Sequence, residues 1–499
     1  ASITLDASDS ISTTTAGTNN VKLGANAGNS ITSDSIRNVL IGDEAGTALA
    51  TGDENVFIGY QAGDTTTDNN ENTGVGYRAL TGDIGDQNTA LGAHCGDAVT
   101  GNRNVLLGYN VAQGAGAIDD NVIIGSGAAS AATFTGNDNV VIGKDAGFDL
   151  TSGHSNVLIG HDVGLELKQG ASNTAVGFQA LATEDDHGRN VAIGISALTT
   201  LNAGTDAENV AVGFNSGASI SSGVQNTLIG TQSGDALSDA DFNVAVGRNA
   251  LSGDTLGSKS TAVGHSALNV QNFTVATNSD NTAVGYLAGS EVTTGIQNTL
   301  IGSRAGDALT GSGFSGTTRQ SGADFNVAVG QAALGADTKG SKSVAVGHSA
   351  LLTQNFTTAT DALNTAVGHA AGTLVETGIQ NTLIGALAGD ALTTGSYNTA
   401  LGYGALSADD LGSQSVAIGY HALVAQNYAT ATTSHNVAVG SNAGANISIG
   451  TLNTAVGGLA LDADTKGSRS VAIGYTALSN QNFTTATDSN NTAVGFQAG

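Results

Sequence analysis

The chain has no proline, methionine or tryptophan, only one cysteine, and few aromatic residues over its 499 positions. A single cysteine excludes a disulfide framework and any cysteine-rich metal module. Only 15 lysines and arginines stand against 42 aspartates and glutamates, which argues against a nucleic-acid partner because phosphates need cationic side chains. No apolar run approaches the ~18 residues of a membrane-spanning helix, so we expect no membrane span.

A short motif repeats along the chain. The pentapeptide Asn-(Val/Thr)-x-(Val/Ile/Leu)-Gly recurs 27 times, for example at Asn38–Gly42, Asn173–Gly177 and Asn491–Gly495, and 16 of the 26 spacings are 17 residues. A period of ~17 residues is too short for a helix pair or a propeller blade. The sequence therefore predicts an all-β fold, a parallel β-solenoid or β-roll of about 27 coils with ~17 residues in each coil.

Each motif position has a physical interpretation. The second and fourth positions are apolar or Thr and share one face of a strand, whereas the third position points the other way and is also apolar in nearly every copy. A strand that is apolar on both faces should be covered on both. We therefore expect one face to fill the coil interior, and the apolar third position to require a neighbouring sheet or a neighbouring chain.

The remaining motif positions predict the corners and the stacking. The fifth-position Gly would turn a corner that other residues cannot adopt without strain. The first position, which we call the anchor, is Asn in 23 copies and should form a ladder of side-chain amides between coils. Three residues after the Gly comes a small residue, as at Ala62, Ala180 and Ala350. Cys95 occupies this slot, and we interpret it as a buried small side chain rather than a reactive thiol.

The repeat also predicts how the chain is divided. We expect a lead-in segment at 1–19, less regular solenoid coils at 20–225, and four-coil super-repeats at 226–499, with a loop inserted at 311–321. The chain begins without an initiator Met or the apolar core of a signal peptide. We interpret this as processing or as part of a longer chain. We also expect further chain or a partner to stack on the C-terminal end, because an uncapped solenoid exposes strand edges.

The motif resembles the head repeats of YadA-like trimeric autotransporter adhesins, and the extended form at 173–181 resembles the repetitive shafts of bacteriophage tail-fibre proteins. The resemblance implies a homotrimeric rod. It also implies a structural, adhesive extracellular fibre that projects or forms a host-binding or surface-binding element, located on a virion as a tail-fibre-like shaft. The alternative is a bacterial cell-surface adhesin or an extracellular filament that binds glycans or matrix.

Four anchors are Ser instead of Asn, at positions 260, 343, 415 and 470, and each starts a 21-residue coil that carries a Gln-Asn-aromatic sequence. An amide pair beside an aromatic ring is suited to a sugar, since the ring stacks on the apolar face and the amides bond hydroxyls. The other interpretation is a turn whose aromatic side chain caps its own apolar edge. The candidate ligand-binding residues are Asn272, Phe273, Asn355, Phe356, Asn427, Tyr428, Asn482 and Phe483.

Other polar patterns point to structural roles. His161, His265, His348 and His369 follow the motif Gly directly, at a position that is Tyr or Phe in many other coils, and we interpret them as one row of corner side chains. A Gly-Ser-(Lys/Gln/Arg) turn before each Ser anchor suggests a salt bridge between chains. We expect no enzyme activity, no metal site and no cofactor. An ice-binding solenoid is a further alternative, but Thr and Val alternate irregularly at the second position.

Overall fold

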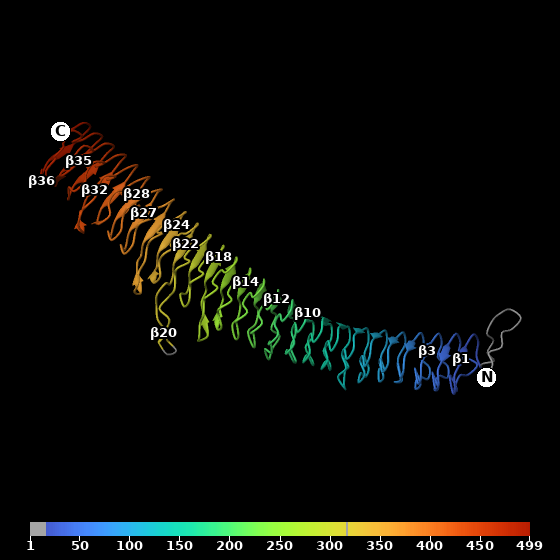
Figure 1. Ribbon diagram of the computed structural model, residues 1–499. Coiled ribbons are helices and arrows are strands. Elements are labelled where there is room, and N and C mark those ends of the chain that lie inside the picture. The colour runs from blue at the N-terminus through green and yellow to red at the C-terminus, as the bar shows by residue number, and fades with distance from the viewer. Residues whose placement is uncertain (1–15, 316–317) are drawn as a thin grey trace. The chain divides into compact units, whose positions relative to one another are not determined.

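The computed structural model describes residues 16–315 and 318–499 (Figure 1). Within these residues the protein is all-β and contains no helix, so no described helix is available to cross a membrane. Each coil contributes one three-residue strand, at the second to fourth motif positions, and the following residues return through turns to the next coil. The predicted parallel β-solenoid with coils of about 17 residues is confirmed.

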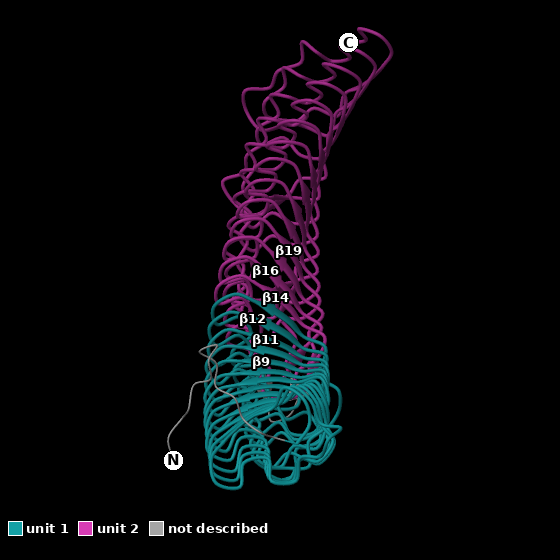
Figure 2. Cartoon of the chain, turned by 90° about the vertical axis from the view of Figure 1, so that its right-hand side faces the viewer, with its two compact units in different colours: residues 1–239 teal, residues 240–499 magenta. Residues whose placement is uncertain are grey.

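The chain forms two compact units, residues 1–239 (teal in Figure 2) and 240–499 (magenta). The first 15 residues of the expected lead-in segment lie outside the described residues. The main strands of the first unit are β1 Val21–Leu23, β2 Val39–Ile41, β3 Val56–Ile58, β4 Thr73–Val75, β5 Thr89–Leu91, β6 Val105–Leu107, β7 Val122–Ile124, β8 Val140–Ile142, β9 Val157–Ile159, β10 Thr174–Val176, β11 Val191–Ile193, β12 Val210–Val212 and β13 Thr227–Ile229.

The second unit continues the same pattern. Its main strands are β14 Val244–Val246, β16 Thr261–Val263, β18 Thr282–Val284, β19 Thr299–Ile301, β22 Val327–Val329, β24 Val344–Val346, β26 Thr365–Val367, β27 Thr382–Ile384, β28 Thr399–Leu401, β30 Val416–Ile418, β32 Val437–Val439, β33 Thr454–Val456, β35 Val471–Ile473 and β37 Thr492–Val494. Within each unit, consecutive main strands pair in parallel and in register, so equal motif positions stack on one another; β2 and β3, for example, align Leu40 with Phe57.

The second unit also contains short strand pairs. Each 21-residue coil forms a two-residue parallel pair with the coil before it, and these pairs are β15 Gly257–Ser258 with β17 Thr277–Asn278, β23 Gly340–Ser341 with β25 Thr360–Asp361, β29 Gly412–Ser413 with β31 Thr432–Thr433, and β34 Gly467–Ser468 with β36 Thr487–Asp488. The inserted segment holds an antiparallel pair, β20 Phe314–Ser315 with β21 Thr318–Arg319. Because β19 still pairs directly with β22, the insertion leaves the strand stack uninterrupted.

The third motif position fills the coil interior. Leu40, Phe57 and Leu158, all at this position, are fully buried, whereas the second and fourth positions of the same strands are only half-buried. The expectation that the third position needs a partner surface is therefore wrong. The narrow coil returns its own turns over that face, and the outward face is the one formed by the second and fourth positions, which we call the strand face.

The glycine corners follow from steric limits. Gly42 and Gly59 have φ values of 134° and 138°, and a Cβ on Gly42 would lie 2.3 Å from the carbonyl oxygen of Gly59 in the next coil. Only glycine accepts both the dihedral angle and the close approach. The small slot is also confirmed, since Ala62 and Cys95 are fully buried there. Burial raises the pKa of the Cys95 thiol to about 12, so the thiol is not activated.

Candidate functional site

The anchor asparagines of neighbouring coils form a hydrogen-bonded ladder. The backbone N–H of Asn55 donates to Oδ1 of Asn38 at 2.9 Å, and its Nδ2 donates to the same oxygen at 3.1 Å and to the Asn69 carbonyl at 2.9 Å. The next anchor, Asn72, makes the same backbone bond to Oδ1 of Asn55 at 3.0 Å. The Asn55 side chain therefore has partners in its own coil and in the coils on both sides, as predicted from the motif.

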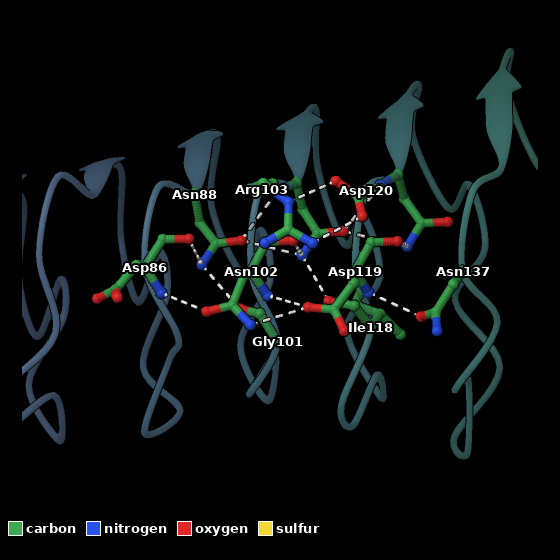
Figure 3. A network of polar contacts seen from close by, with 11 residues as sticks. Asp86, Asn88, Gly101, Asn102, Arg103, Ile118, Asp119, Asp120 and Asn137 are labelled. Atoms are coloured by element: carbon green, nitrogen blue, oxygen red, sulfur yellow. Dashed lines mark hydrogen bonds and ion pairs between the residues drawn. The ribbon is translucent and has the colours of Figure 1, made fainter.

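A second polar ladder lies two residues before the anchors and was not predicted. Over residues 53–137 this row alternates between Asp and Asn, and Figure 3 shows its part from Asp86 to Asn137. The N–H of Asp86 donates to Asn102 Oδ1 at 2.8 Å, and the N–H of Asn102 donates to Asp119 Oδ1 at 2.7 Å. Because coils are ~4.8 Å apart, alternation keeps like charges about twice that distance apart.

A shallow hollow of about 540 Å³ runs beside this ladder. It is lined by Asp53, Glu54, Asn70, Glu71, Asp86, Gln87, Asn102 and Arg103. Several of these groups already bond within the ladder or to each other, as when Gln87 Nε2 donates to Glu71 Oε2 at 2.9 Å. The lining is therefore a set of paired surface side chains belonging to successive coils.

A third row, eleven residues after the anchor, points into the coil in most coils, and we call it the interior slot. It usually holds a buried apolar side chain, as at Leu49 and Leu150. In the second unit the coil before each Ser anchor carries Asp in this slot, and the Ser-anchored coil carries Gln. The four stacked pairs are Asp254–Gln271, Asp337–Gln354, Asp409–Gln426 and Asp464–Gln481, with Asp Oδ2 and Gln Nε2 separated by 2.5–2.6 Å.

The Gln of each pair repairs the anchor ladder. Gln271 Nε2 also donates to Ser260 Oγ at 2.9 Å, and its Oε1 accepts a hydrogen bond from Nδ2 of the next anchor, Asn281, at 2.8 Å. A Ser anchor has a hydroxyl group and no side-chain amide. Gln271 of the same coil supplies the amide instead. The Gln of the Gln-Asn-aromatic sequence is therefore a structural element of the ladder, a role that the sequence did not reveal.

The buried Asp is satisfied by hydrogen bonds rather than by a cation. Asp254 Oδ1 accepts the N–H groups of Gly257 and Phe273, each at 3.0 Å. Burial raises the pKa of Asp254, and the hydrogen bonds from Gln271, Phe273 and Gly257 oppose that rise. The cluster therefore holds the turn and the loop in place through three donors.

The aromatic residues of the candidate loops lie inside the protein. Phe273, Phe356 and Tyr428 are buried, and the Tyr428 hydroxyl donates to the Gly450 carbonyl at 2.8 Å. Their rings offer no face to a sugar, so the ring-stacking interpretation is wrong for these three loops. The rings instead cap the interior, which is the alternative that the sequence left open. Phe483 is half-buried.

The asparagines of the same loops are exposed, and three of them accept a hydrogen bond from a threonine of the preceding coil. Asn272 Oδ1 accepts the Thr255 hydroxyl at 3.0 Å, and Asn355 and Asn482 accept Thr338 and Thr465 in the same way. Asn427 is also exposed. The loops therefore present short polar edges that are tied to the preceding coil.

The basic turns before the Ser anchors do not need a second chain to find a partner. Lys342 Nζ lies 2.6 Å from Asp361, and Arg469 lies 3.4 Å from Asp488, in each case one coil further along the same chain. These side chains are largely exposed, and exposed pairs contribute ~0–1 kcal/mol. The expected salt bridge between chains is thus replaced by a bridge between coils for these two residues.

The corner row is confirmed as a row of stacked rings. Tyr60 and Tyr77 stack with ring centroids 5.5 Å apart, and His94 packs edge-on against Tyr77 at 5.1 Å. His348 and His369 stack at 5.3 Å with an interplanar angle of 9°. These rings immediately follow the corner glycine, so they line the border of the strand face.

One interior slot of the first unit carries a carboxyl group between two leucines. Glu184 is fully buried between Leu167 and Leu201, which occupy the same slot in the adjacent coils. Its Oε1 accepts the His187 N–H at 3.3 Å, and its Oε2 has no hydrogen-bond partner. Burial raises the pKa of Glu184 to about 7, although hydrogen bonds from backbone groups oppose the rise.

No protein-family model matches the chain, and no curated protein matches it significantly.

Proposed function

We propose that this chain is the shaft of a structural, adhesive extracellular fibre that assembles from copies of itself along the strand face. The observation that carries the proposal is the outward exposure of apolar side chains at the fourth motif position. Ile229 in the first unit is 40% exposed, and Ile301 and Leu401 in the second unit are 39% and 43% exposed. Monomeric soluble proteins rarely leave contiguous apolar strips of more than a few hundred Å² uncovered.

The corner row extends this surface. Tyr77 and Tyr109 in the first unit, and Tyr286 and Tyr420 in the second, are each about half exposed beside the strand face. Tyrosine is enriched at protein interfaces because it combines a large apolar ring with a polar tip. An apolar strip with an aromatic border supports an interface that runs along each unit.

The free energy gained by burying the apolar strand face is sufficient for association. Burying about 60 Å² of apolar surface per coil at ~25 cal/mol/Å² contributes ~1.5 kcal/mol per coil. A dozen or so coils would contribute about 20 kcal/mol, which exceeds the ~4–15 kcal/mol that association costs. Three copies around a common axis would cover one strand face on each chain in a closed ring. The homotrimer implied by the sequence resemblance is the assembly that we propose.

The charge distribution supports an isolated fibre. The 42 acidic residues outnumber the 15 basic residues, and the acids are concentrated in turns away from the main strands. Like charges on the turns would oppose sideways association of finished fibres. We place such a fibre outside the cell, as a tail-fibre-like shaft of a virion or as a bacterial surface adhesin. Its role would be to hold a host-binding or surface-binding element at a distance.

The test is the mass of the full chain under native conditions. We expect sedimentation velocity and native mass spectrometry to give three times the chain mass. The double variant Ile384→Glu/Leu401→Glu, which places charges on the strand face of β27 and β28, should weaken that assembly. The control Leu374→Glu/Leu452→Glu changes two apolar side chains that are similarly exposed outside the strand face, and it should keep the mass. A monomeric parent chain would refute the proposal.

A further inference from the structure

Three side chains that can bind metals converge at one corner of the first unit. Lys144 and Asp145 follow the corner glycine Gly143, and His161 and Asp162 follow Gly160 in the next coil. One ligand atom from each of Asp145, His161 and Asp162 lies within 4.8 Å of the others. The sequence interpretation treated His161 only as a member of the corner row, because nothing in its own coil indicates that Asp145 lies beside it.

The solenoid itself creates this convergence. In-register stacking places Asp162 over Asp145, and the N–H of Asp162 donates to the Lys144 carbonyl at 3.2 Å. Both aspartates have left-handed backbone angles, with φ of 52° and 56°, as do other residues at this position. Their side chains therefore leave two adjacent coils from equivalent backbone conformations. The coil geometry, rather than a flexible loop, sets the distance between the two carboxyl groups.

Two stacked carboxylates are unfavourable unless positive charge lies close. Adjacent coils are ~4.8 Å apart, and like charges at that distance repel by about 1 kcal/mol or more. The second polar ladder avoids this repulsion by alternating Asp with Asn, but the Asp145–Asp162 pair does not. Lys144 Nζ lies 2.7 Å from Asp145 Oδ2, and His161 Nε2 lies 3.2 Å from Asp162 Oδ1. The corner thus brings two carboxyl groups together with one imidazole ring.

The site is open to an ion from solution. The side chains of His161, Asp145 and Asp162 are 47%, 27% and 22% exposed, so they are accessible yet held by their surroundings. His161 also packs against Phe178 of the next coil, with ring centroids 5.5 Å apart, which limits the orientations of the imidazole. A restricted imidazole loses less freedom when it binds a ligand.

We propose that Asp145, His161 and Asp162 form a binding site for a divalent transition-metal ion such as Zn²⁺. One imidazole nitrogen and two carboxylate oxygens are ligands that Zn²⁺, Ni²⁺ and Co²⁺ accept, whereas Ca²⁺ and Mg²⁺ require more oxygen ligands. Ligand atoms in a tetrahedral zinc site are about 3.4 Å apart at Zn–ligand distances of ~2.1 Å. The 3.2 Å separation of His161 Nε2 and Asp162 Oδ1 is close to that value. Asp145 lies within 4.8 Å of both ligand atoms, and a rotation of its side chain away from Lys144 would bring it into coordination distance. Water completes the coordination.

The bound ion links two consecutive coils. Asp145 belongs to the coil that starts at Asn139, and both other ligands belong to the coil that starts at Asn156. An ion that binds only the folded coils stabilises them, and the stabilisation grows with the logarithm of the ion concentration once this exceeds the dissociation constant. Lys144 competes for Asp145, so it lowers the affinity. The site therefore acts as a metal-dependent clamp between coils, independent of the fibre assembly proposed above.

The experiment titrates the full chain, freed of metal by a chelator, with Zn²⁺ in a calorimeter and with Co²⁺ under visible absorption. We expect one ion per chain, a rise in melting temperature with Zn²⁺, and a Co²⁺ spectrum typical of nitrogen and oxygen ligands. His161→Ala and Asp162→Asn should each lower the affinity at least tenfold, and Lys144→Gln should raise it severalfold.

The control is His154→Ala, which removes an exposed histidine of the same unit outside the cluster. It should bind as the parent chain does. Circular dichroism of each variant without metal establishes that the coils remain folded, so a lost affinity can be assigned to the ligands. Absence of saturable binding below millimolar Zn²⁺, or unchanged binding by His161→Ala, would overturn the proposal.

Discussion

Gln271 lies one coil beyond Asp254 and donates from Nε2 to Asp254 Oδ2 at 2.6 Å, with both side chains fully buried. The same Gln carries the amide that the Ser260 anchor lacks, so one side chain satisfies the carboxylate and continues the ladder. A buried charge that loses a partner is strongly destabilising, whereas an apolar pair of similar size is tolerated. The two residues should therefore be energetically coupled.

Replacing these residues tests that coupling. We expect Gln271→Leu and Asp254→Leu each to reduce the stability of the second unit by about 3 kcal/mol, because each leaves buried polar groups unsatisfied. The double variant should lose ~1–3 kcal/mol less than the sum. Hydrogen exchange of the flanking strands β14 and β16 measures the loss. The pair Asp254→Leu with Gln426→Leu, from two separate clusters, should be additive; additivity in the first pair would contradict the interpretation.

The corner glycines should tolerate no side chain. A Cβ on Gly59 would lie 2.2 Å from the Gly76 carbonyl oxygen, at a φ of 138°. We expect Gly59→Ala to destabilise the first unit by several kcal/mol, since both the dihedral angle and the neighbouring coil oppose it. Gly204→Ala is the matched control, because its Cβ would meet nothing within 4 Å and only its φ of 68° is unfavourable. Equal thermal shifts for the two variants would argue against close packing of the corners.

Glu184 should make the first unit less stable as pH rises. Its pKa is raised to about 7 in the folded protein, above the ~4.3 of an exposed Glu. The unfolded chain therefore releases this proton first, and stability falls from about pH 4.5 and levels off above pH 7. The total loss should not exceed about 4 kcal/mol.

The control variant for this effect is Glu184→Gln, which keeps the size of the side chain but cannot titrate. A second control is Glu184→Leu, which places in this slot the residue found there in both adjacent coils. The difference in melting temperature between the parent chain and Glu184→Gln, followed from pH 4.5 to 7.5, cancels the contributions of titratable groups that do not interact with Glu184. His187 Nδ1 lies 3.8 Å from Glu184 Oε1 and is therefore part of the effect that this difference measures. We expect the parent chain to lose stability relative to the variant across that range. A constant difference would show that Glu184 does not titrate there.

Removal of one super-repeat should leave the fold intact. Residues 296–300 and 379–383 have the same sequence, Ile-Gln-Asn-Thr-Leu, so deletion of 298–380 restores the same junction. Each coil contacts its neighbours only, and stability depends on those contacts. Circular dichroism and the melting temperature should stay close to those of the parent chain. Deletion of 298–372, which breaks the register, should unfold the adjoining coils; equal behaviour of both deletions would contradict the nearest-neighbour interpretation.

Much of the fold could be read from the repeat, because in-register stacking makes each position meet its own copies. The Gly corners, the small slot at Cys95 and the ladder at Asn38 and Asn55 all follow from that rule. The direction in which the third-position side chain points could not be predicted, because a strand that is apolar on both faces does not indicate which face lies inside the coil. The role of the Gln-Asn-aromatic loops could not be predicted for a related reason. An aromatic side chain such as Phe273 can stack on a sugar or fill the interior of the coil, and the sequence does not distinguish the two.

The sequence by itself determined the parallel β-solenoid, its coil length and its register, since periodicity and glycine sterics leave few other ways to stack 27 similar motifs. Only the tertiary structure decided that Gln271 completes the anchor ladder, that Glu184 is buried between leucines, and that Asp145 lies beside His161. These contacts join different coils through side chains whose directions depend on the turns between strands. The turns vary from coil to coil, so the repeat alone does not predict where their side chains point.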